Sequence, residues 1–379
     1  MKVLRAFKSV DVRTNRHKTS VLGFVLASVL FSVGLVGVPK LVDAKPIVSI
    51  TKDDDWKTAP LPQGVNKKQI DALVKAAMGP RDNRIRVRSV LITINDKIVY
   101  ERYHPIDNKD SILDTFSVSK SFVATVIGML IDDGKLSLDQ PAPVAAWSNP
   151  NDPRSAITIR NLLHMSSGLT WKEDYSAGDS STIAMLFAPV ASDYAIALPL
   201  EFKPGTQFEY NSGNSAILMR IITDTLGGTP QAEAYIKKRL LDPLGIKKVV
   251  YQRDLSGRIV GFMGINMTAR DQARFGLLYL RNGMWGKKKV ISPEWVKFSS
   301  TPSPTFPGYA GHWWTQYLLG TNASPGDFTA LGYYGQYVTV SRSKRMVMVI
   351  NTAFEGTPTE QTAKARNLVQ SLYALFPLR

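Results

Sequence analysis

The chain contains no cysteine among its 379 residues and only four histidines. The missing cysteine excludes disulfide bridges, a thiolate nucleophile, thiolate metal sites and lipid attachment at a cysteine. It does not argue for the cytoplasm, because an exported protein with a large core folds without disulfides. No aspartate is an evident partner for any of the four histidines, His17, His104, His164 and His312. The sequence therefore does not support a Ser-His-Asp triad.

Acidic residues are in short supply: 31 Asp and Glu stand against 47 Lys and Arg, a formal net charge of +16. A basic surface suits anionic partners such as lipid head groups or cell-envelope polymers. The chain lacks the basic helix and the aromatic-basic alternation typical of nucleic-acid binding. We therefore expect no nucleic-acid partner, allow contact with a membrane or an anionic envelope, and leave the oligomeric state open.

Residues 1–44 have the pattern of an export signal. Basic residues precede an uncharged run over 21–38, and Val42-Asp-Ala44 suits cleavage after Ala44. The run is also about long enough to span a bilayer, so an uncleaved membrane anchor is the alternative. Both interpretations predict a bacterial protein that is periplasmic or anchored to the outer face of the inner membrane. Residues 45–66 are polar and contain prolines, and we expect a linker there before a single domain at 67–379.

Hydrophobic periodicity places strands near both ends of this domain and helices between them. Strands are expected at 87–94 and 97–103, joined by Asn95-Asp96, and at 334–340 and 346–351. The expected helices include 67–78, 157–165, 214–226, 231–241, 268–282 and 359–375. We predict an α+β fold in which an antiparallel sheet takes strands from both ends of the chain and is flanked by helices. The middle of the chain forms a mostly helical lobe, and the cleft between lobe and sheet is the natural place for a site.

Ser117-Val-Ser-Lys120 stands at the start of a run, 114–131, that we expect to be an amphipathic helix. Side chains three positions apart share a helix face, so the serine and lysine are within reach of each other. A lysine with a depressed pKa is able to take the proton of a serine hydroxyl and make it a nucleophile. Two other S-x-x-K matches, at 49–52 and 341–344, do not begin a helix. The alternative is an ordinary helix start with a capping serine and a solvated lysine.

Tyr210 is the candidate for proton transfer to a leaving group. It follows the turn Pro204-Gly205 at the entrance to a helix. A tyrosine hydroxyl near a cationic lysine is able to shuttle protons as general acid or base. The alternative is a half-buried structural aromatic residue.

These residues together resemble the serine β-lactamase and penicillin-recognising family, within its β-lactamase-related group of class C enzymes, esterases and nylon-oligomer (6-aminohexanoate-dimer) hydrolases. The resemblance covers about residues 67–376. Ser117-Val-Ser-Lys120 is similar to the family's S-x-x-K, and Tyr210-Asn-Ser212 to its Y-x-N or Y-x-S. Supporting segments are ITIRNLLHMSSGL (157–169), PGTQFEYNS (204–212), LDPLGI (241–246) and MTARDQARFGLLYL (267–280).

The family's third motif, K-T-G or H-T-G, is missing. The equivalent stretch, TALGYYGQ at 329–336, is similar to a G-x-x-G-Q pattern of the nylon-oligomer branch. In β-lactamases the basic residue of this motif helps to hold the substrate carboxylate, so its absence argues against β-lactam hydrolysis. The sequence also offers no glutamate in a setting like the one that activates the deacylating water of class A enzymes.

The resemblance implies a β-lactamase/transpeptidase-like fold and an acyl-enzyme route that needs no cofactor and no metal. Ser117 is then the nucleophile, Lys120 the general base and Tyr210 the proton shuttle. Backbone N–H groups of Ser117 and of a strand at Gly332–Gln336 are expected to form the oxyanion hole. Tyr175 resembles a mobile-loop tyrosine of the nylon-oligomer branch that assists an amide leaving group. The expected substrate-binding residues are Tyr175, Ser212, Asn266, Gly332, Gly335, Gln336 and Trp313, with turn and core as the alternative roles of Asn266 and Trp313.

We thus expect a serine hydrolase of a small ester or amide. A cell-wall D-alanyl-D-peptidase or β-lactamase-type enzyme is one alternative, favoured by the export signal and basic charge. A catalytically silent homologue that serves as a binding module is the other.

Overall fold

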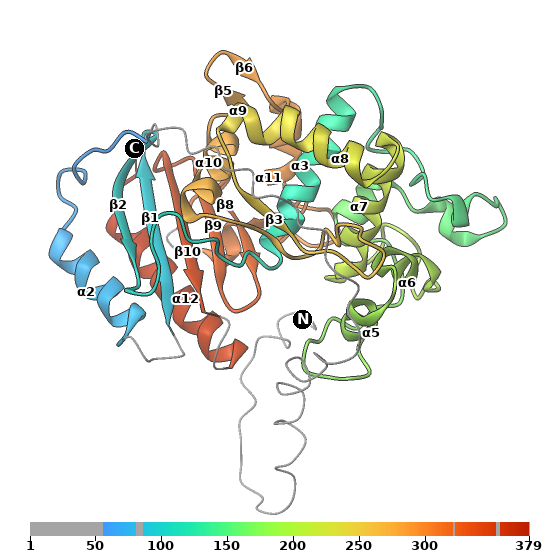
Figure 1. The fold of residues 1–379 in the computed structure, drawn as a ribbon, viewed down its shortest axis with the longest axis horizontal. Coiled ribbons are helices and arrows are strands. Elements are labelled where there is room, and N and C mark those ends of the chain that lie inside the picture. Colours follow the sequence, from blue (N-terminus) through green and yellow to red (C-terminus); the bar gives the residue numbers. More distant parts are fainter. Residues whose placement is uncertain (1–55, 81–85, 321–322, 354–356, 379) are drawn as a thin grey trace, which may run out of the picture. The chain divides into compact units, whose positions relative to one another are not determined.

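The computed structural model describes residues 56–80, 86–320, 323–353 and 357–378. Its centre is a six-stranded antiparallel sheet in the order β2-β1-β10-β9-β8-β7 (Figure 1). The strands are β1 (Val87–Ile94), β2 (Lys97–Tyr103), β7 (Trp314–Thr315), β8 (Phe328–Gly332), β9 (Gln336–Ser341) and β10 (Met346–Thr352).

The predicted pairing of strands from the two ends of the chain is confirmed. β1 pairs with β10 in a register that joins Val90 to Ile350 and Ile94 to Met346. The β1–β2 hairpin turns at Asn95 and Asp96, whose φ angles of 48° and 67° both lie in the left-handed region. Two such residues in succession are what a tight two-residue hairpin requires, and Asn and Asp tolerate them best.

Alternating side chains of the sheet enter two separate hydrophobic cores. Met346, Met348 and Ile350 of β10 pack in one core with residues of α2 (Lys67–Met78) and α12 (Pro358–Leu375). Val347 and Val349 enter the other core, with residues of α10 (Ala269–Leu280) and of the middle of the chain. The sheet is therefore covered by helices on both faces.

The middle of the chain is mostly helical, as predicted, and shares the second core with the sheet. Its helices are α4 (Ile159–Leu163), α5 (Ser181–Phe187), α6 (Ala191–Ala197), α7 (Ser212–Leu226), α8 (Thr229–Ile236), α9 (Asp242–Leu244) and α11 (Pro293–Ser300). Short pairs of strands accompany them: β3 (Val249–Tyr251) with β4 (Ile265–Met267), and β5 (Met284–Trp285) with β6 (Lys288–Lys289).

Helix α3 (Val118–Asp132) differs from the prediction. Every residue from Val118 to Leu130 is buried, so the helix is not amphipathic. It packs against α7 on one side and against β8 and β9 on the other, which leaves no solvated face. Gly128 marks a close approach, because a Cβ there would lie 2.4 Å from the Trp295 ring. The sheet and the middle lobe thus enclose the helix that begins after Ser117.

The predictions for residues 1–44, and for the linker up to Asp55, lie outside the described residues. Residues 57–59 lie along β2, which is an edge strand of the sheet. Thr58 forms a parallel bridge with Ile98 of β2, and the Ala59 N–H donates to the Ile98 carbonyl at 2.9 Å. Among the helices that the structure describes, none combines the length and the hydropathy needed to span a bilayer.

Candidate active site

Ser117 is positioned by an unusual backbone turn at the start of α3. The preceding residue, Phe116, has φ of 45°, which a bulky side chain rarely adopts and which marks local strain. Ser117 itself is helical, and its hydroxyl makes no capping hydrogen bond. The hydroxyl is therefore not occupied by the helix end and is available for chemistry.

Lys120 is 1% exposed and lies beside this hydroxyl. Its Nζ is 3.0 Å from Ser117 Oγ, 2.9 Å from Ser212 Oγ and 3.0 Å from the Phe262 carbonyl oxygen. Burial lowers the pKa of Lys120 to about 8, although the nearby charge of Glu173 acts in the opposite direction. At pH 7 about a tenth of the Lys120 amine is then neutral, and the neutral form dominates above pH 8. Because Lys120 is buried, the alternative of a solvated lysine at an ordinary helix start is wrong.

Tyr210 lies on the same side of the site as Lys120, whose Nζ is 5.2 Å from the centroid of the tyrosine ring. The ring stacks on Trp314 at 5.5 Å and meets Tyr309 edge-on at 6.0 Å. Burial and the Glu173 charge raise the pKa of Tyr210 well above its ordinary value, while interaction with the Ser117 hydroxyl lowers it in part. The phenol therefore keeps its proton and is a donor next to the nucleophile.

Ser212 is fully buried and links Lys120 to a carboxylate. Its hydroxyl donates to Glu173 Oε1 at 2.5 Å, and its backbone N–H donates to Oε2 at 2.9 Å. The Trp171 Nε1–H donates to the same Oε2 at 2.6 Å. Glu173 was not predicted from the sequence. It lies in an irregular loop, 39 positions before Ser212, where neither periodicity nor a motif marks it.

The structure also brings Tyr175 to the site. Its ring stacks on Tyr333 at 4.5 Å, and its hydroxyl oxygen is buried. Burial, followed by the charges of Glu173 and Tyr210, raises its pKa well above the ordinary value. Tyr175 is therefore a second protonated phenol within electrostatic range of the first.

The strand predicted at Gly332–Gln336 is a turn in the structure. β8 ends at Gly332 and β9 begins at Gln336, and Tyr334 and Gly335 between them have φ angles of 61° and 88°. Gly332 lies directly against the segment before Ser117, because a Cβ there would be 2.3 Å from the Thr115 carbonyl oxygen. The first half of this turn therefore borders the nucleophile.

Three predicted substrate-binding residues are engaged inside the fold instead. Gly335 packs against α12, where its Cβ would lie 2.6 Å from that of Ala365. The Gln336 amide is fully buried and is hydrogen-bonded to Thr352: its Nε2 donates to Thr352 Oγ1 at 2.9 Å, and its Oε1 accepts from the Thr352 N–H at 3.0 Å. Trp313 is fully buried among core aromatic rings, so the core role is correct for it.

Asn266 fastens the segment that leads to Ser117. Its Oδ1 accepts from the Thr115 N–H at 3.1 Å, and its Nδ2 donates to Asp114 at 3.1 Å. Asn266 lies in strand β4, so the turn that the sequence offered as its alternative role is wrong, although the contacts of its side chain are structural.

The two buried histidines of the middle lobe, His164 and His312, have partners other than Ser117 and Lys120. His312 lies 2.9 Å from Ser215 Oγ and 2.9 Å from the Leu163 carbonyl oxygen, and His164 stacks on Phe298. Among the described residues, no group of His, Asp and Glu has the arrangement of a metal site.

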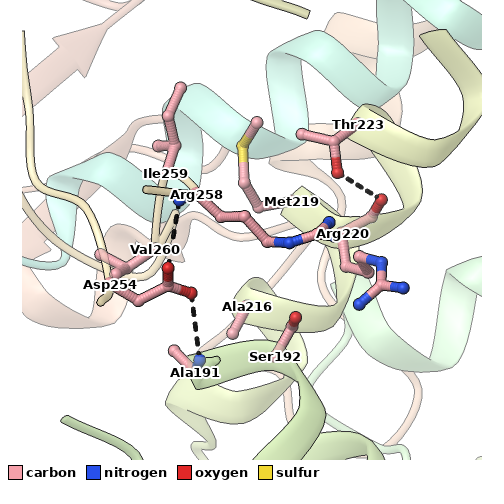
Figure 2. A pocket seen from close by; sticks show the side chains of 10 residues that line it. All are labelled: Ala191, Ser192, Ala216, Met219, Arg220, Thr223, Asp254, Arg258, Ile259 and Val260. Atoms are coloured by element: carbon pink, nitrogen blue, oxygen red, sulfur yellow. Dashed lines mark hydrogen bonds between the residues drawn. The ribbon is translucent and has the colours of Figure 1, made fainter. Parts of the chain in front are cut away.

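A small cavity between α6, α7 and the loop at 254–260 is separate from these residues (Figure 2). Its volume is about 10 Å³, which is room for roughly one water molecule. Asp254 closes it by accepting from the N–H groups of Ala191 and Arg258, both at 3.1 Å. The cavity is too small for a substrate.

Known proteins show to which family the chain belongs. The Beta-lactamase family model matches residues 70–372, so the chain belongs to the β-lactamase family. A 6-aminohexanoate-dimer hydrolase of Paenarthrobacter ureafaciens is 27% identical over 247 residues, which cover 58% of this chain and 60% of that protein. The match thus spans less than two thirds of this relative.

Solved structures share the fold. A Bacillus anthracis protein, provisionally described as a 6-aminohexanoate-dimer hydrolase, superposes with a TM-score of 0.67 at 21% identity, covering 84% of this chain and 87% of that one. EstCE1, described as a hydrolase with promiscuous acyltransferase activity, gives a TM-score of 0.63 at 16% identity, covering 80% of this chain and 98% of its own. The predicted β-lactamase/transpeptidase-like fold is confirmed.

Proposed function

We propose that the protein is a serine hydrolase that cleaves a small ester or amide through an acyl-enzyme on Ser117. The observation that carries this proposal is the buried Lys120, whose Nζ lies 3.0 Å from Ser117 Oγ and whose pKa is lowered to about 8. A neutral amine at hydrogen-bond distance is the base that a serine hydroxyl needs before it attacks a carbonyl carbon.

In the proposed reaction Lys120 takes the Ser117 proton while Oγ attacks the substrate carbonyl. The Ser117 N–H at the start of α3, together with an N–H of the β8–β9 turn beside Thr115, would bind the developing oxyanion. Tyr210 donates its proton to the departing alkoxide or amine. Water then attacks the acyl-enzyme, and the same groups act in the opposite direction.

Ester hydrolysis is the activity we expect first, because an alkoxide leaves with less need of a proton than an amine does. The 6-aminohexanoate-dimer hydrolase among the relatives makes a linear amide the second substrate class to examine. The stretch at 329–336 carries no basic side chain to hold a substrate carboxylate, which disfavours β-lactams. A cell-wall peptidase role, with the protein exported to the periplasm or anchored at the membrane, remains the competing proposal. A penicillin-binding protein 4 of Amycolatopsis lactamdurans, 30% identical over 200 residues that cover 46% of its length, supports it.

The test compares the purified protein with its Ser117→Ala and Lys120→Ala variants. The substrates are p-nitrophenyl acetate and butyrate, a linear amide dimer, nitrocefin, and a D-alanyl-D-alanine peptide for the competing role. Ester turnover that Ser117→Ala abolishes and Lys120→Ala nearly abolishes, with nitrocefin and the peptide uncleaved, supports the proposal. No turnover of any substrate, combined with no mass increase after treatment with a fluorophosphonate, refutes it and favours a catalytically silent binding homologue.

A further inference from the structure

The neighbours of Lys120 determine where its lone pair points. A neutral amine has two N–H donors and one lone pair, and Nζ has three polar neighbours within 3.0 Å. The Phe262 carbonyl oxygen only accepts hydrogen bonds, so it takes one N–H. The second N–H and the lone pair are left for Ser117 and Ser212.

Glu173 decides between these two serines. A carboxylate has no proton to give, so the 2.5 Å contact requires the Ser212 hydroxyl to donate to Glu173 Oε1. Glu173 cannot rotate away, because Oε2 is held by the Ser212 backbone N–H and by Trp171 Nε1–H. With its proton committed, Ser212 Oγ only accepts from Lys120. The lone pair of the amine is then left for the Ser117 hydroxyl.

The geometry points to Glu173 as a positioning residue for the catalytic base: it fixes the Ser212 hydroxyl as an acceptor and thereby directs the Lys120 lone pair at Ser117. This role deepens the proposed hydrolase function and rests on it. Glu173 does not touch the reacting atoms and acts through Ser212.

The same arrangement serves the step that follows. When the bond from Ser117 Oγ to the substrate carbon forms, the serine proton moves to Lys120 Nζ, which becomes an ammonium with three donors. Phe262 and Ser212 accept two of them, as before, and the third remains near Ser117 for transfer toward Tyr210 and the leaving group. The Glu173 carboxylate, linked to the ammonium through the Ser212 hydroxyl, stabilises it as it forms.

The decisive variant is Glu173→Gln, which keeps the shape and removes the charge. The glutamine is able to donate from Nε2 to Ser212 Oγ, which frees the Ser212 proton to bind the Lys120 lone pair in competition with Ser117. We expect the plateau of kcat/KM for p-nitrophenyl acetate to fall by about tenfold or more, the scale of loss seen when a hydrogen-bond partner that orients a metal ligand is removed. Because Glu173 favours the ammonium form of Lys120, its loss should also move the acid limb of the pH profile to lower pH.

Asp174→Asn is the matched control. It removes the same charge from the next residue, whose carboxylate accepts from the N–H and Oγ–H of Ser176 at 2.8 and 2.7 Å. We expect the wild-type plateau and acid limb for this variant. A general loss of charge in the loop would alter both variants alike.

Ser212→Ala tests the same chain of contacts at the residue between Glu173 and Lys120. It also provides the test if Glu173→Gln fails to fold. It removes the oxygen through which Glu173 acts, so its plateau should fall by a similar factor. The double variant should be no worse than Ser212→Ala alone, because both changes break one chain of contacts.

The inference would be overturned if a folded Glu173→Gln variant kept both the plateau and the acid limb of the wild type. It would also be overturned if Ser212→Ala kept the wild-type plateau. Neither result would affect the hydrolase proposal. An inactive wild-type protein without fluorophosphonate labelling would instead remove the proposed function, and the inference with it.

Discussion

The Nζ of Lys120 lies 3.0 Å from the Oγ of Ser117, inside a helix with no solvated face. Burial holds the pKa of this lysine near 8, below its ordinary value of about 10.5, because a charged amine is poorly solvated there. Only the neutral form accepts the serine proton. This pair therefore ties the activity of the protein to pH.

We expect kcat/KM for p-nitrophenyl acetate to rise with pH through an acid limb near pH 8 and then to level off. Below the limb Lys120 is protonated and cannot act as a base; above it the neutral amine dominates. The measurement is initial rates from about pH 6 to about pH 10, corrected for spontaneous hydrolysis. A profile that is flat through this range would mean that Lys120 is not the base.

Tyr210→Phe should separate amides from esters. The ring keeps its packing on Trp314, but the proton donor for the leaving group is gone. Amide turnover should fall by about 10²- to 10⁴-fold, the usual contribution of a general acid, and p-nitrophenyl ester turnover much less. Tyr309→Phe, which removes a neighbouring hydroxyl, is the control. Equal kcat/KM values for wild type and Tyr210→Phe on both substrates would rule out the acid role.

The adjacent Trp313 and Trp314 should respond differently to mutation. Trp313→Ala empties a fully buried position among core rings and should cost about 3–5 kcal/mol of unfolding free energy. Trp314→Leu removes the ring on which Tyr210 stacks and should lower kcat/KM in a protein that remains folded. Denaturant unfolding and ester kinetics on both variants provide the comparison. The reverse pattern would show that Trp313, as first expected from the sequence, lines the site.

Acid should destabilise the protein through its buried histidines. Burial lowers the pKa of His312 to about 3 and that of His164 to about 4, from about 6.5 in the unfolded chain. Between these values the unfolded state binds more protons, so stability falls as pH falls, by about 1.4 kcal/mol per pH unit for each histidine. Urea unfolding at pH 7 and pH 5 measures the loss. In His312→Gln the unfolding free energy should depend less on pH. An unchanged dependence would mean that His312 is not a source of the loss in acid.

The sequence predicted those parts of the fold that local patterns encode. Alternation and the Asn95-Asp96 turn gave the β1–β2 hairpin with its observed bounds, and the periodicity of 67–78 gave α2. Ser117 and Lys120 are one helical turn apart, so their contact also follows from local geometry. The family motif then indicated Tyr210 and Ser212, which the structure places beside Lys120.

What remained hidden depends on contacts between distant segments. Glu173 matters only because its loop meets the start of α7, which no local pattern encodes. Both Trp313 and Trp314 are buried, but in different cores, and only Trp314 stacks on Tyr210. The sequence cannot show which ring enters which core, because successive side chains point to opposite sides. The sequence predicted that Gln336 binds substrate, because it lies in the same motif as Gly332. Gly332 borders the segment before Ser117, but the side-chain amide of Gln336 is hydrogen-bonded to Thr352 inside the fold.

The pairing of β1 with β10 also has a consequence for the chain as it is synthesised. Ser117 and Lys120 leave the ribosome early, whereas β8, β9 and β10, which support their helix and complete the sheet, come from residues 328–352 of the 379. Closing so long a loop is slow, and until it closes α3 has no buried setting in which Lys120 could lose its proton. A nascent or partly folded chain would therefore contain Ser117 and Lys120 but would not form the acyl-enzyme. Ser117 would become reactive only in the completed protein.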